Sequence, residues 1–282
     1  MTELKDYKKT KEYLVCVDSD GCAMDTMDIK HFNCFGPCMV EEWSLKEFSE
    51  EILYRWNEVN LYTLTRGINR FKGLALALTE INEKHRAIEG ACEFYEWAQN
   101  ANELSNEAIE RELKKENTHP IFQKALNWSK AVNEKIKALP KEEVKPFLNV
   151  KKALEFAHGF ADIAVVSSAN LGAVLEEWER FKLLECTDIV LSQNVGSKAF
   201  CIAELLKKGY DKSKVLMCGD APGDKAAAEK NGVAFYPILV KKEAASWQEF
   251  IDRGLPALIN NEYFGEYQTA KNTQFLNNLG GK

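Results

Sequence analysis

Residues 13–21 read YLVCVDSDG, a short apolar run that stops at two aspartates and a glycine. Apolar runs of this length, rich in β-branched residues and ended by Asp and Gly, are typical of a buried strand that leads into a loop. We therefore predict a strand at 13–17, with Asp18, Asp20 and Gly21 in the loop at its carboxyl end.

Helices and strands are expected to alternate after residue 150. The apolar runs IAVV, DIVL, VLMC and VAFYP predict strands, and the segments between them have helical character. The predicted strands are 163–166, 188–191, 215–218 and 233–237, and the predicted helices are 150–158, 171–184, 197–208 and 225–231. Gly232 follows the last helix, where a C′ glycine is common. Strands separated by such helices form a parallel sheet, so the sequence predicts an α/β fold with a doubly wound, Rossmann-like core.

The segment between the first strand and residue 150 has a different composition. It is rich in Glu, Lys, Leu, Ala and aromatic residues, with helical periodicity and almost no strand pattern. Ser44 followed by Glu47 resembles a capping box that opens a helix through about residue 59. Further helices are predicted at 67–83, at 87–103, from Ser105 onward and at 120–139, before Pro140. We expect three segments: core at 1–25, an inserted all-helical cap domain at 26–146, and the remaining core at 147–282.

The composition is that of an ordinary globular protein, with 282 residues, 45% of them hydrophobic and 28% charged. A formal net charge of −6 makes nucleic acid and anionic membranes unfavourable partners. No apolar run reaches the roughly 20 residues of a membrane helix, and the N-terminal segment lacks the apolar stretch of a secretory signal. The eight cysteines are scattered, as expected of reduced, mostly buried thiols in a cytoplasmic protein.

One local group of residues raises the question of a zinc site. His31, Cys34 and Cys38 lie close together in the sequence, but an obvious fourth ligand and a paired CxxC motif are missing. Packing and solvent exposure account for these three residues better than zinc binding does.

Polar side chains suited to chemistry follow four of the predicted strands. They lie at the strand end, or in the loop and helix start after it: Asp18 and Asp20, Ser167, Lys198, and Asp220 with Asp224. In open parallel sheets, ligands bind just past the carboxyl ends of the strands. We therefore expect these groups to converge at one edge of the sheet.

The charges of these residues indicate a magnesium site. Carboxylates at Asp18, Asp220 and Asp224 would repel one another in a shared pocket, and a hard divalent cation with oxygen ligands relieves that repulsion. The cation also screens an anionic nucleophile from an anionic phosphate. Lys198 adds a fixed positive charge, and Asp20 could protonate a leaving oxygen and then activate water. The expected substrate is a small phosphorylated metabolite.

Four segments together resemble the motifs of the haloacid dehalogenase (HAD) superfamily. They are DSDG at 18–21, the strand that ends in Ser167, the lysine of GSK at Lys198, and GDAPGD at 219–224. The resemblance covers 13–21 and 150–237, and the helical insertion after the first motif resembles a large C1-type cap. It implies a HAD-like phosphatase, that is, a phosphoric monoester hydrolase.

The resemblance also implies a role for each catalytic residue. Asp18 would be the nucleophile that forms an aspartyl-phosphate, and Asp20 the general acid and base. Ser167 and Lys198 would stabilise the phosphate and the intermediate. Two hypotheses stay open beside these: Ser168 could replace its neighbour Ser167, and Lys198 could be a solvated lysine in the first turn of a helix.

The same resemblance implies the magnesium ligands. These would be Asp18, Asp20 through its carbonyl, and Asp220, with Asp224 supporting the metal. Asp224 could instead be the N-cap of the helix that follows it.

Two positions depart from the pattern of the superfamily. Cys22 occupies a position where Thr or Ser is usual, which removes a hydroxyl and adds an oxidisable thiol beside the site. Ser19 is smaller and more polar than the residue often found between the two aspartates. Neither departure removes a group that the chemistry needs.

The helical segment contains one group of cations around a glycine, TRGINRFK at 65–72. Arg66, Arg70 and Lys72 could face the active site and bind a phosphate or carboxylate of the substrate. Surface cations are common, so a solvated role is the alternative. For the whole chain, the alternatives to a phosphohydrolase are a sugar-phosphate phosphomutase of the same superfamily and a non-catalytic binding module on the same fold.

Overall fold

The computed structural model describes residues 3–281 and separates the chain into two compact units. The core unit, Met1–Met27 with Val144–Lys282, contains the sheet, and the helical unit is Asp28–Glu143. Each has its own hydrophobic core. Val17 and Trp178 belong to that of the core unit, and Phe71 and Trp128 to that of the helical unit.

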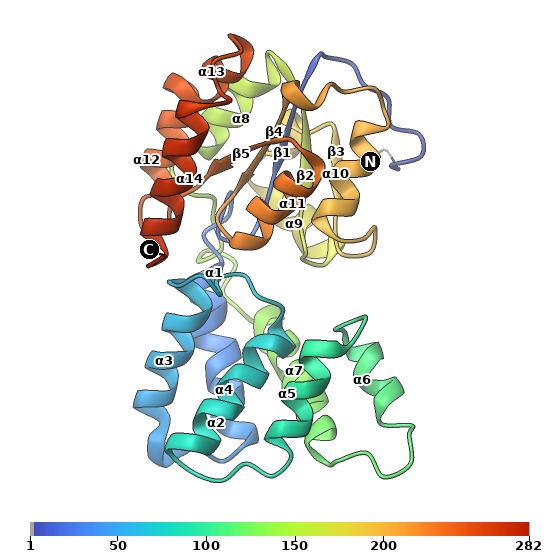
Figure 1. The fold of residues 1–282 in the computed structure, drawn as a ribbon, viewed down its shortest axis with the longest axis vertical. Helices are drawn as coiled ribbons and strands as arrows, with labels where there is room; N and C mark the ends of the chain where they lie inside the picture. The colour runs from blue at the N-terminus through green and yellow to red at the C-terminus, as the bar shows by residue number, and fades with distance from the viewer. Residues whose placement is uncertain (1–2, 282) are drawn as a thin grey trace. The chain divides into compact units, whose positions relative to one another are not determined.

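The core unit is built on five parallel strands in the order β3-β2-β1-β4-β5 (Figure 1). The strands are β1 (Tyr13–Val17), β2 (Ala161–Val166), β3 (Ile189–Leu191), β4 (Val215–Gly219) and β5 (Ala234–Pro237). The chain adds β2 and β3 on one side of β1 and then returns to add β4 and β5 on the other. This order is doubly wound, as predicted, and its switch point lies between β1 and β4.

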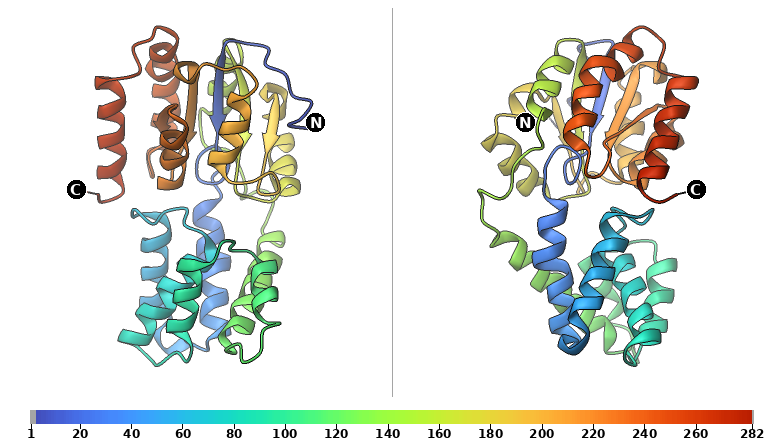
Figure 2. Two further views of the ribbon diagram at one scale, coloured as in Figure 1. Left: turned by 45° about the vertical axis from the view of Figure 1, so that its right-hand side comes forward. Right: turned by 90° about the vertical axis from the view of Figure 1, so that its left-hand side faces the viewer.

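Helices cover both faces of this sheet (Figures 1 and 2). Val15 and Val17 point into one hydrophobic cluster with α8 (Val150–His158), α9 (Leu171–Arg180) and α12 (Glu243–Glu249). Leu14 and Cys16 alternate with them and are fully buried on the opposite face. That face is covered by α10 (Lys198–Leu206), next to β2, and by α11 (Pro222–Asn231), next to β4 and β5.

The C-terminal segment closes the edge of the sheet at β5. It contains α13 (Leu255–Ile259) and α14 (Glu266–Asn278), and α14 packs against β5. The side chain of Asn278 accepts a hydrogen bond from the Val240 backbone N–H at 2.9 Å and donates one to its carbonyl at 3.2 Å. The hydroxyl of Tyr263 donates to the carbonyl of Phe235 at 2.6 Å. These contacts satisfy backbone groups at and just beyond an edge that would otherwise be open to pairing.

The helical unit contains seven α-helices, which pack around buried aromatic side chains such as Phe71, Phe94 and Trp128. They are α1 (Met27–Lys30), α2 (Gly36–Glu42), α3 (Ser49–Leu61), α4 (Arg70–Lys84), α5 (Ala91–Asn100), α6 (Asn106–Glu112) and α7 (Ile121–Lys137). A π-helical turn, His31–Phe35, joins α1 to α2. The all-helical insertion predicted from the sequence is present.

Some predicted helix boundaries agree with the structure and others do not: the helix predicted at 171–184 ends at Arg180, and the one predicted from 225 begins at Pro222. Ser105 caps α6, because its hydroxyl accepts a hydrogen bond from the Ala108 N–H at 3.1 Å. The capping box predicted at Ser44 is wrong. Ser44 has a left-handed φ of 53°, and α3 begins at Ser49, after a 3₁₀ turn and without a side-chain cap.

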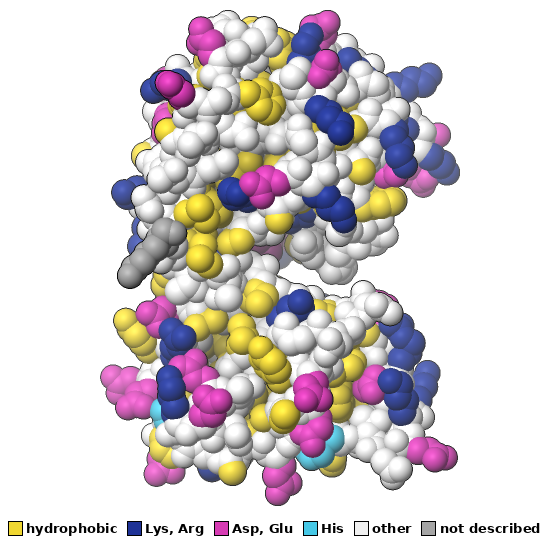
Figure 3. Space-filling model, viewed as in Figure 1, with side chains coloured by type: hydrophobic (Ala, Val, Ile, Leu, Met, Phe, Trp, Pro, Cys, Tyr) yellow, Lys and Arg dark blue, Asp and Glu magenta, His cyan; other side chains and the backbone are white. Residues whose placement is uncertain are grey.

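Charged side chains of both signs are interspersed over the visible face of each unit (Figure 3). None of the helices in residues 3–281 combines the length and apolar character that a membrane span requires. All eight cysteines are free thiols, and six of them are buried.

Candidate functional site

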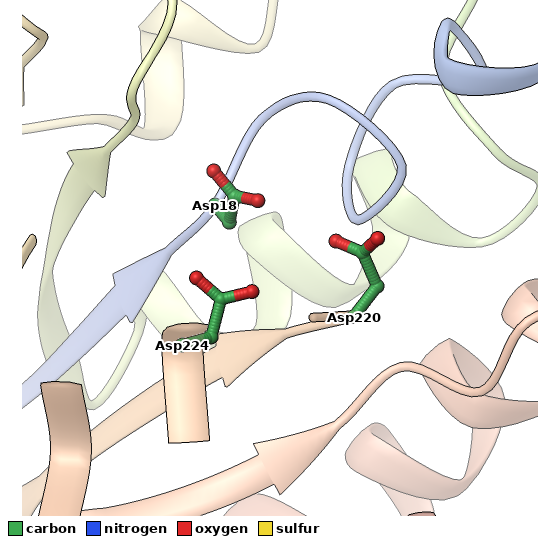
Figure 4. Close-up of side chains that lie close together, drawn as sticks. All are labelled: Asp18, Asp220 and Asp224. Atoms are coloured by element: carbon green, nitrogen blue, oxygen red, sulfur yellow. The ribbon is translucent and has the colours of Figure 1, made fainter. Parts of the chain in front are cut away.

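Three aspartates bring their carboxylates together at the carboxyl edge of the sheet (Figure 4). One oxygen each from Asp18, Asp220 and Asp224 lies within 4.8 Å of the other two. The residues are 5%, 1% and 0% exposed, so water alone cannot offset the repulsion between their charges. Among residues 3–281, these form the one cluster of His, Cys, Asp or Glu side chains with ligand atoms close enough to share a metal ion.

The switch point of the sheet explains why Asp18 and Asp220 meet. Asp18 follows β1, and Asp220 follows β4, the neighbour of β1. The register pairs Val17 with Cys218, and the N–H of Asp18 continues this ladder by donating to the Cys218 carbonyl at 3.0 Å. Both carboxylates therefore come from the first residues beyond adjacent strands.

Asp224 comes from the first turn of α11. Its Oδ2 accepts a hydrogen bond from the Ala221 N–H at 3.0 Å, which holds the start of the helix. Its Oδ1 lies 2.5 Å from the ammonium nitrogen of Lys198. Asp224 is thus the third helical residue and not the N-cap, and it combines a capping bond with a place in the carboxylate cluster.

Lys198 lies between two of the carboxylates. Its Nζ is 2.8 Å from Asp18 Oδ1, and only 15% of its side chain is exposed. Lys198 is the first residue of α10, where Ser197 caps the helix by accepting a hydrogen bond from the Phe200 N–H at 3.2 Å. The structure does not support the alternative of a solvated lysine in the first turn.

Burial and the attraction between opposite charges have opposite effects on the pKa values of Asp18 and Lys198. Burial raises the pKa of Asp18 well above its usual value; Lys198 opposes the rise, and the nearby Asp224 and Asp220 carboxylates add to it. Burial disfavours the ammonium of Lys198, but Asp18 and Asp224 outweigh it and raise the pKa of Lys198. Three carboxylates and one ammonium carry a formal charge of −2, which matches a divalent cation with hard oxygen ligands.

The loop after Asp18 is a closed turn. Gly21 has a φ of 78°, a conformation that suits glycine, and its N–H donates to the Met24 carbonyl at 2.8 Å. The carbonyl of Ser19 accepts hydrogen bonds from the N–H groups of Cys22, Ala23 and Met24, at 3.3, 3.0 and 2.8 Å. The loop therefore returns on itself within a few residues.

Asp20 lies outside the carboxylate cluster and is partly exposed. The buried hydroxyl of Thr26 donates to Asp20 Oδ1 at 2.5 Å. Thr26 was not among the residues predicted from the sequence, because a lone threonine six positions from Asp20 has no distinctive pattern. The hydrogen bond from Thr26 restrains one carboxylate oxygen of Asp20.

Comparison with known protein families identifies the chain. The sequence model of the family described as "Haloacid dehalogenase-like hydrolase" matches residues 93–238, just over half of the 282 residues. The chain belongs to the haloacid dehalogenase-like hydrolases. The match begins inside the helical unit, so the resemblance at Asp18 and Asp20 depends on the motif itself and on the geometry above.

Several solved structures are similar to this chain. A haloacid dehalogenase-like family hydrolase from Streptococcus pneumoniae is 12% identical, with a TM-score of 0.47 over 84% of this chain and 90% of that one. A predicted phosphatase from Clostridium acetobutylicum is 16% identical, with a TM-score of 0.47 over 81% and 85%. A predicted phosphoglycolate phosphatase from Haemophilus somnus is 15% identical, with a TM-score of 0.44 over 81% and 85%. A comparison with curated proteins found no match.

Ser167, one of the site residues predicted from the sequence, directly follows β2. The register pairs Val17 with Val165, so Ser167 lies one step beyond the level of Asp18 on the neighbouring strand. Ser167 is 3% exposed, and its hydroxyl accepts a hydrogen bond from the Ala169 N–H at 3.1 Å. Ser168 is exposed, which favours Ser167 of the two.

The three cations predicted as substrate contacts have different surroundings in the helical unit. Arg66 is 3% exposed and donates to the Leu61 carbonyl at 2.7 Å. Arg70 begins α4 and is partly buried, and Lys72 follows it in the first turn. The hydrogen-bond partners of Arg70 in the described residues are the neutral groups of Ser129 and Asn133.

The residues considered for a zinc site and Cys22 also have defined surroundings. Nδ1 of His31 accepts a hydrogen bond from the Trp56 indole at 3.0 Å, and His31, Cys34 and Cys38 form no metal-like cluster within the described residues. Cys22 is fully buried, and this burial, with the nearby Asp220 and Asp18, raises the pKa of its thiol. The thiolate is the reactive form, so burial protects Cys22 from oxidation.

Proposed function

We propose that this chain is a magnesium-dependent phosphohydrolase that cleaves small phosphate monoesters through an aspartyl-phosphate on Asp18. The observation that carries the proposal is the buried cluster of Asp18, Asp220 and Asp224 with Lys198 at the switch point of the sheet. Membership of a hydrolase family supports the reaction type. A phosphate ester as substrate and Mg²⁺ as the metal are inferred from the charges of these four side chains.

The donor set fits Mg²⁺. Asp18 and Asp220 would bind it directly, together with the carbonyl of Asp20, and Asp224 would support it through its place in the cluster. The cluster contains neither imidazole nor thiolate, the ligands typical of zinc sites. When bound, Mg²⁺ would neutralise charge on the carboxylates and on the phosphoryl oxygens.

Asp18 is the proposed nucleophile. One of its carboxylate oxygens attacks phosphorus, the bond from phosphorus to the leaving oxygen breaks, and the leaving oxygen takes a proton from Asp20. Lys198 pairs with Asp18 Oδ1 at 2.8 Å, which keeps the carboxylate oriented and its charge partly offset. Ser167, which follows the neighbouring strand β2, would donate a hydrogen bond from its hydroxyl to a phosphoryl oxygen.

Asp20 then acts in the opposite sense. Its carboxylate accepts a proton from water, the water oxygen attacks phosphorus, and the bond from phosphorus to Asp18 breaks to release inorganic phosphate. The hydrogen bond from Thr26 holds one oxygen of Asp20 and orients the carboxylate for proton exchange. The partial exposure of Asp20 suits a group that meets both the leaving alcohol and water.

Arg70 is the cation of the helical unit that we favour as a substrate contact. Its Nη1 donates to Ser129 Oγ at 3.0 Å and to Asn133 Oδ1 at 2.7 Å, and its guanidinium lies 5.2 Å from the ring centre of Phe35. These neutral partners orient the charge without cancelling it. Lys72 remains a second proposed contact and Arg66 a third, and Arg66 is 3% exposed and donates to the Leu61 carbonyl.

The test is phosphate release from a panel of phosphate monoesters with and without Mg²⁺. We expect release that requires Mg²⁺ and falls by about 10³-fold or more in Asp18→Asn, which keeps the side-chain volume but removes the nucleophile. Asp252→Asn, on the exposed surface of the core unit, is the matched control and should retain full activity.

Three results would contradict the proposal. Isomerised sugar phosphate in place of free phosphate would indicate a phosphomutase, and calorimetry that detects no Mg²⁺ binding would indicate a binding module without turnover. Phosphate release that is unaffected by Asp18→Asn would exclude this aspartate as the nucleophile.

A further inference from the structure

We propose that two buried tryptophans, Trp178 and Trp247, position the loop at residues 18–24, which carries the proposed nucleophile and is called the nucleophile loop. This inference rests on the proposed function. The indole N–H of Trp178 donates to Ser19 Oγ at 2.9 Å. The indole N–H of Trp247 donates to the Cys22 carbonyl at 3.0 Å. The two tryptophans lie on α9 and α12, and each bond spans more than 150 residues of sequence.

All four residues in these bonds are 0% exposed. An indole has one donor and no acceptor, so each tryptophan has a single hydrogen bond to make. With water excluded, neither indole N–H can exchange its partner for solvent at low cost. The bonds therefore restrain the loop, in contrast to bonds at an exposed surface.

The restraint acts at the two ends of the turn. Ser19 lies between Asp18 and Asp20, and its carbonyl also accepts the three N–H bonds that close the turn. Cys22 is the first of those three donors. Fixing the Ser19 side chain and the Cys22 carbonyl fixes the backbone from which both acidic side chains project.

This arrangement accounts for one of the two departures from the family pattern, Ser19. Ser19 supplies a hydroxyl acceptor, which a larger apolar residue between the aspartates would lack. Cys22 is held through its backbone carbonyl, while its thiol contacts the Cys218 carbonyl of β4 at 3.5 Å. Trp178 and Trp247 are positioning residues: they act through the loop and do not touch the reacting atoms.

The experiment compares Trp178→Phe, Ser19→Ala and the double variant, with Trp247→Phe as a second test. Trp128→Phe is the matched control, because Trp128 is also 0% exposed and donates to the Phe35 carbonyl, but in the helical unit. Hydrogen exchange at the loop amides and steady-state kinetics with Mg²⁺ are measured for each variant.

We expect the exchange protection of the Cys22, Ala23 and Met24 amides to fall about tenfold in each loop variant and to stay unchanged in the control. We expect kcat to fall by about tenfold to a hundredfold while KM changes by less than about threefold, because displaced catalytic groups affect the chemical step. The double variant Ser19→Ala/Trp178→Phe should lose no more kcat than either single one, since all three remove the same bond.

Unchanged loop protection in Trp178→Phe and Ser19→Ala would overturn the proposal whatever the activity. Lost protection with an unchanged kcat would overturn it as well, because the restraint would then not reach the acidic side chains. A wild-type protein that releases no phosphate would overturn the proposed function instead. Mg²⁺ affinity, measured by calorimetry, would then test the positioning claim. We expect Trp178→Phe to bind Mg²⁺ about tenfold more weakly than the wild type. Equal affinity in the two proteins would overturn the claim.

Discussion

Gly219 has no side chain at the point where Asp224 enters the carboxylate cluster. A Cβ added to Gly219 would lie 2.3 Å from Cβ and 2.4 Å from Cγ of Asp224, closer than real Cβ contacts allow. Asp224 cannot move away at low cost, because its two oxygens are bonded to the Ala221 N–H and to Lys198. The end of β4 is therefore glycine so that a carboxylate of α11 can lie against it.

Gly219→Ala should displace Asp224 and weaken the site. We expect a loss of about 1–3 kcal/mol in the free energy of unfolding, from overpacking, together with weaker Mg²⁺ binding. Urea denaturation and calorimetry measure the two effects. Gly223→Ala is the control, since nothing lies within 4 Å of its added Cβ and alanine favours the helix. Equal stability and Mg²⁺ affinity in both variants would contradict the argument.

Lys198→Met should separate turnover from metal binding. The variant loses the cation beside Asp18 and Asp224, so phosphate release should fall by about 10²–10³-fold. It also removes a positive charge that repels the metal, so Mg²⁺ should bind about tenfold more tightly. Calorimetry measures the affinity, and phosphate release measures the turnover.

Metal removal from Lys198→Met should have a larger effect than metal removal from the wild type. Without the lysine and without a bound cation, the buried carboxylates have no positive partner. Removing one partner of a buried ion pair costs about 3–5 kcal/mol in the free energy of unfolding. Urea denaturation with Mg²⁺ and with EDTA tests this. Lys225→Met, which loses only a pair with Glu229 on α11, should respond to EDTA as the wild type does. An EDTA effect in Lys198→Met no larger than in the wild type would count against the prediction.

The core of the fold can be predicted from the sequence because its signals are local. Short apolar runs that end in Asp, Ser or Gly mark the first four strands, and the helix predicted at 150–158 coincides with α8. Gly232 has the φ of 67° expected of a helix-ending glycine. The parallel arrangement then follows from alternation, and it brings Asp18 next to Asp220.

The features that the sequence does not reveal depend on contacts between distant residues. Ser44 and Glu47 match a capping box, but the chain at Ser44 is left-handed, so the pattern has no helix to cap. The sequence does not reveal α1 as a separate helix or the start of α2, because α1 has only four residues and α2 begins with Gly36 and Pro37, which weaken a helical pattern. The bond from Trp178 to the nucleophile loop has no local signature.

Arg70→Gln tests the proposed substrate contact in the helical unit. Burial lowers the pKa of Arg70, and its partners Ser129 and Asn133 are neutral, so an anion is the ligand that would stabilise its charge. We expect KM to rise about tenfold or more with kcat little changed, as when a charged hydrogen bond is lost. Arg111→Gln, an exposed arginine paired with Glu103, is the control. An unchanged KM for every active ester would exclude Arg70 as a contact.

Asp162, at the start of β2, should make the stability of the fold depend on acid pH. It is fully buried and accepts hydrogen bonds from the Thr10 and Lys11 N–H groups and from the Tyr210 hydroxyl. Burial opposes its ionisation, but the bonds from Thr10 and Tyr210 outweigh burial and hold its pKa below the usual value. Its contribution to the free energy of unfolding is therefore complete above the unfolded pKa of about 3.9 and is lost as pH falls through the lower folded pKa.

Asp162→Asn should lower the free energy of unfolding by about 1–3 kcal/mol at pH 7, and the difference from wild type should shrink below about pH 4. Urea denaturation from pH 7 to pH 3 measures this, with Asp252→Asn as the exposed control, and a difference that stays constant with pH would refute the assignment.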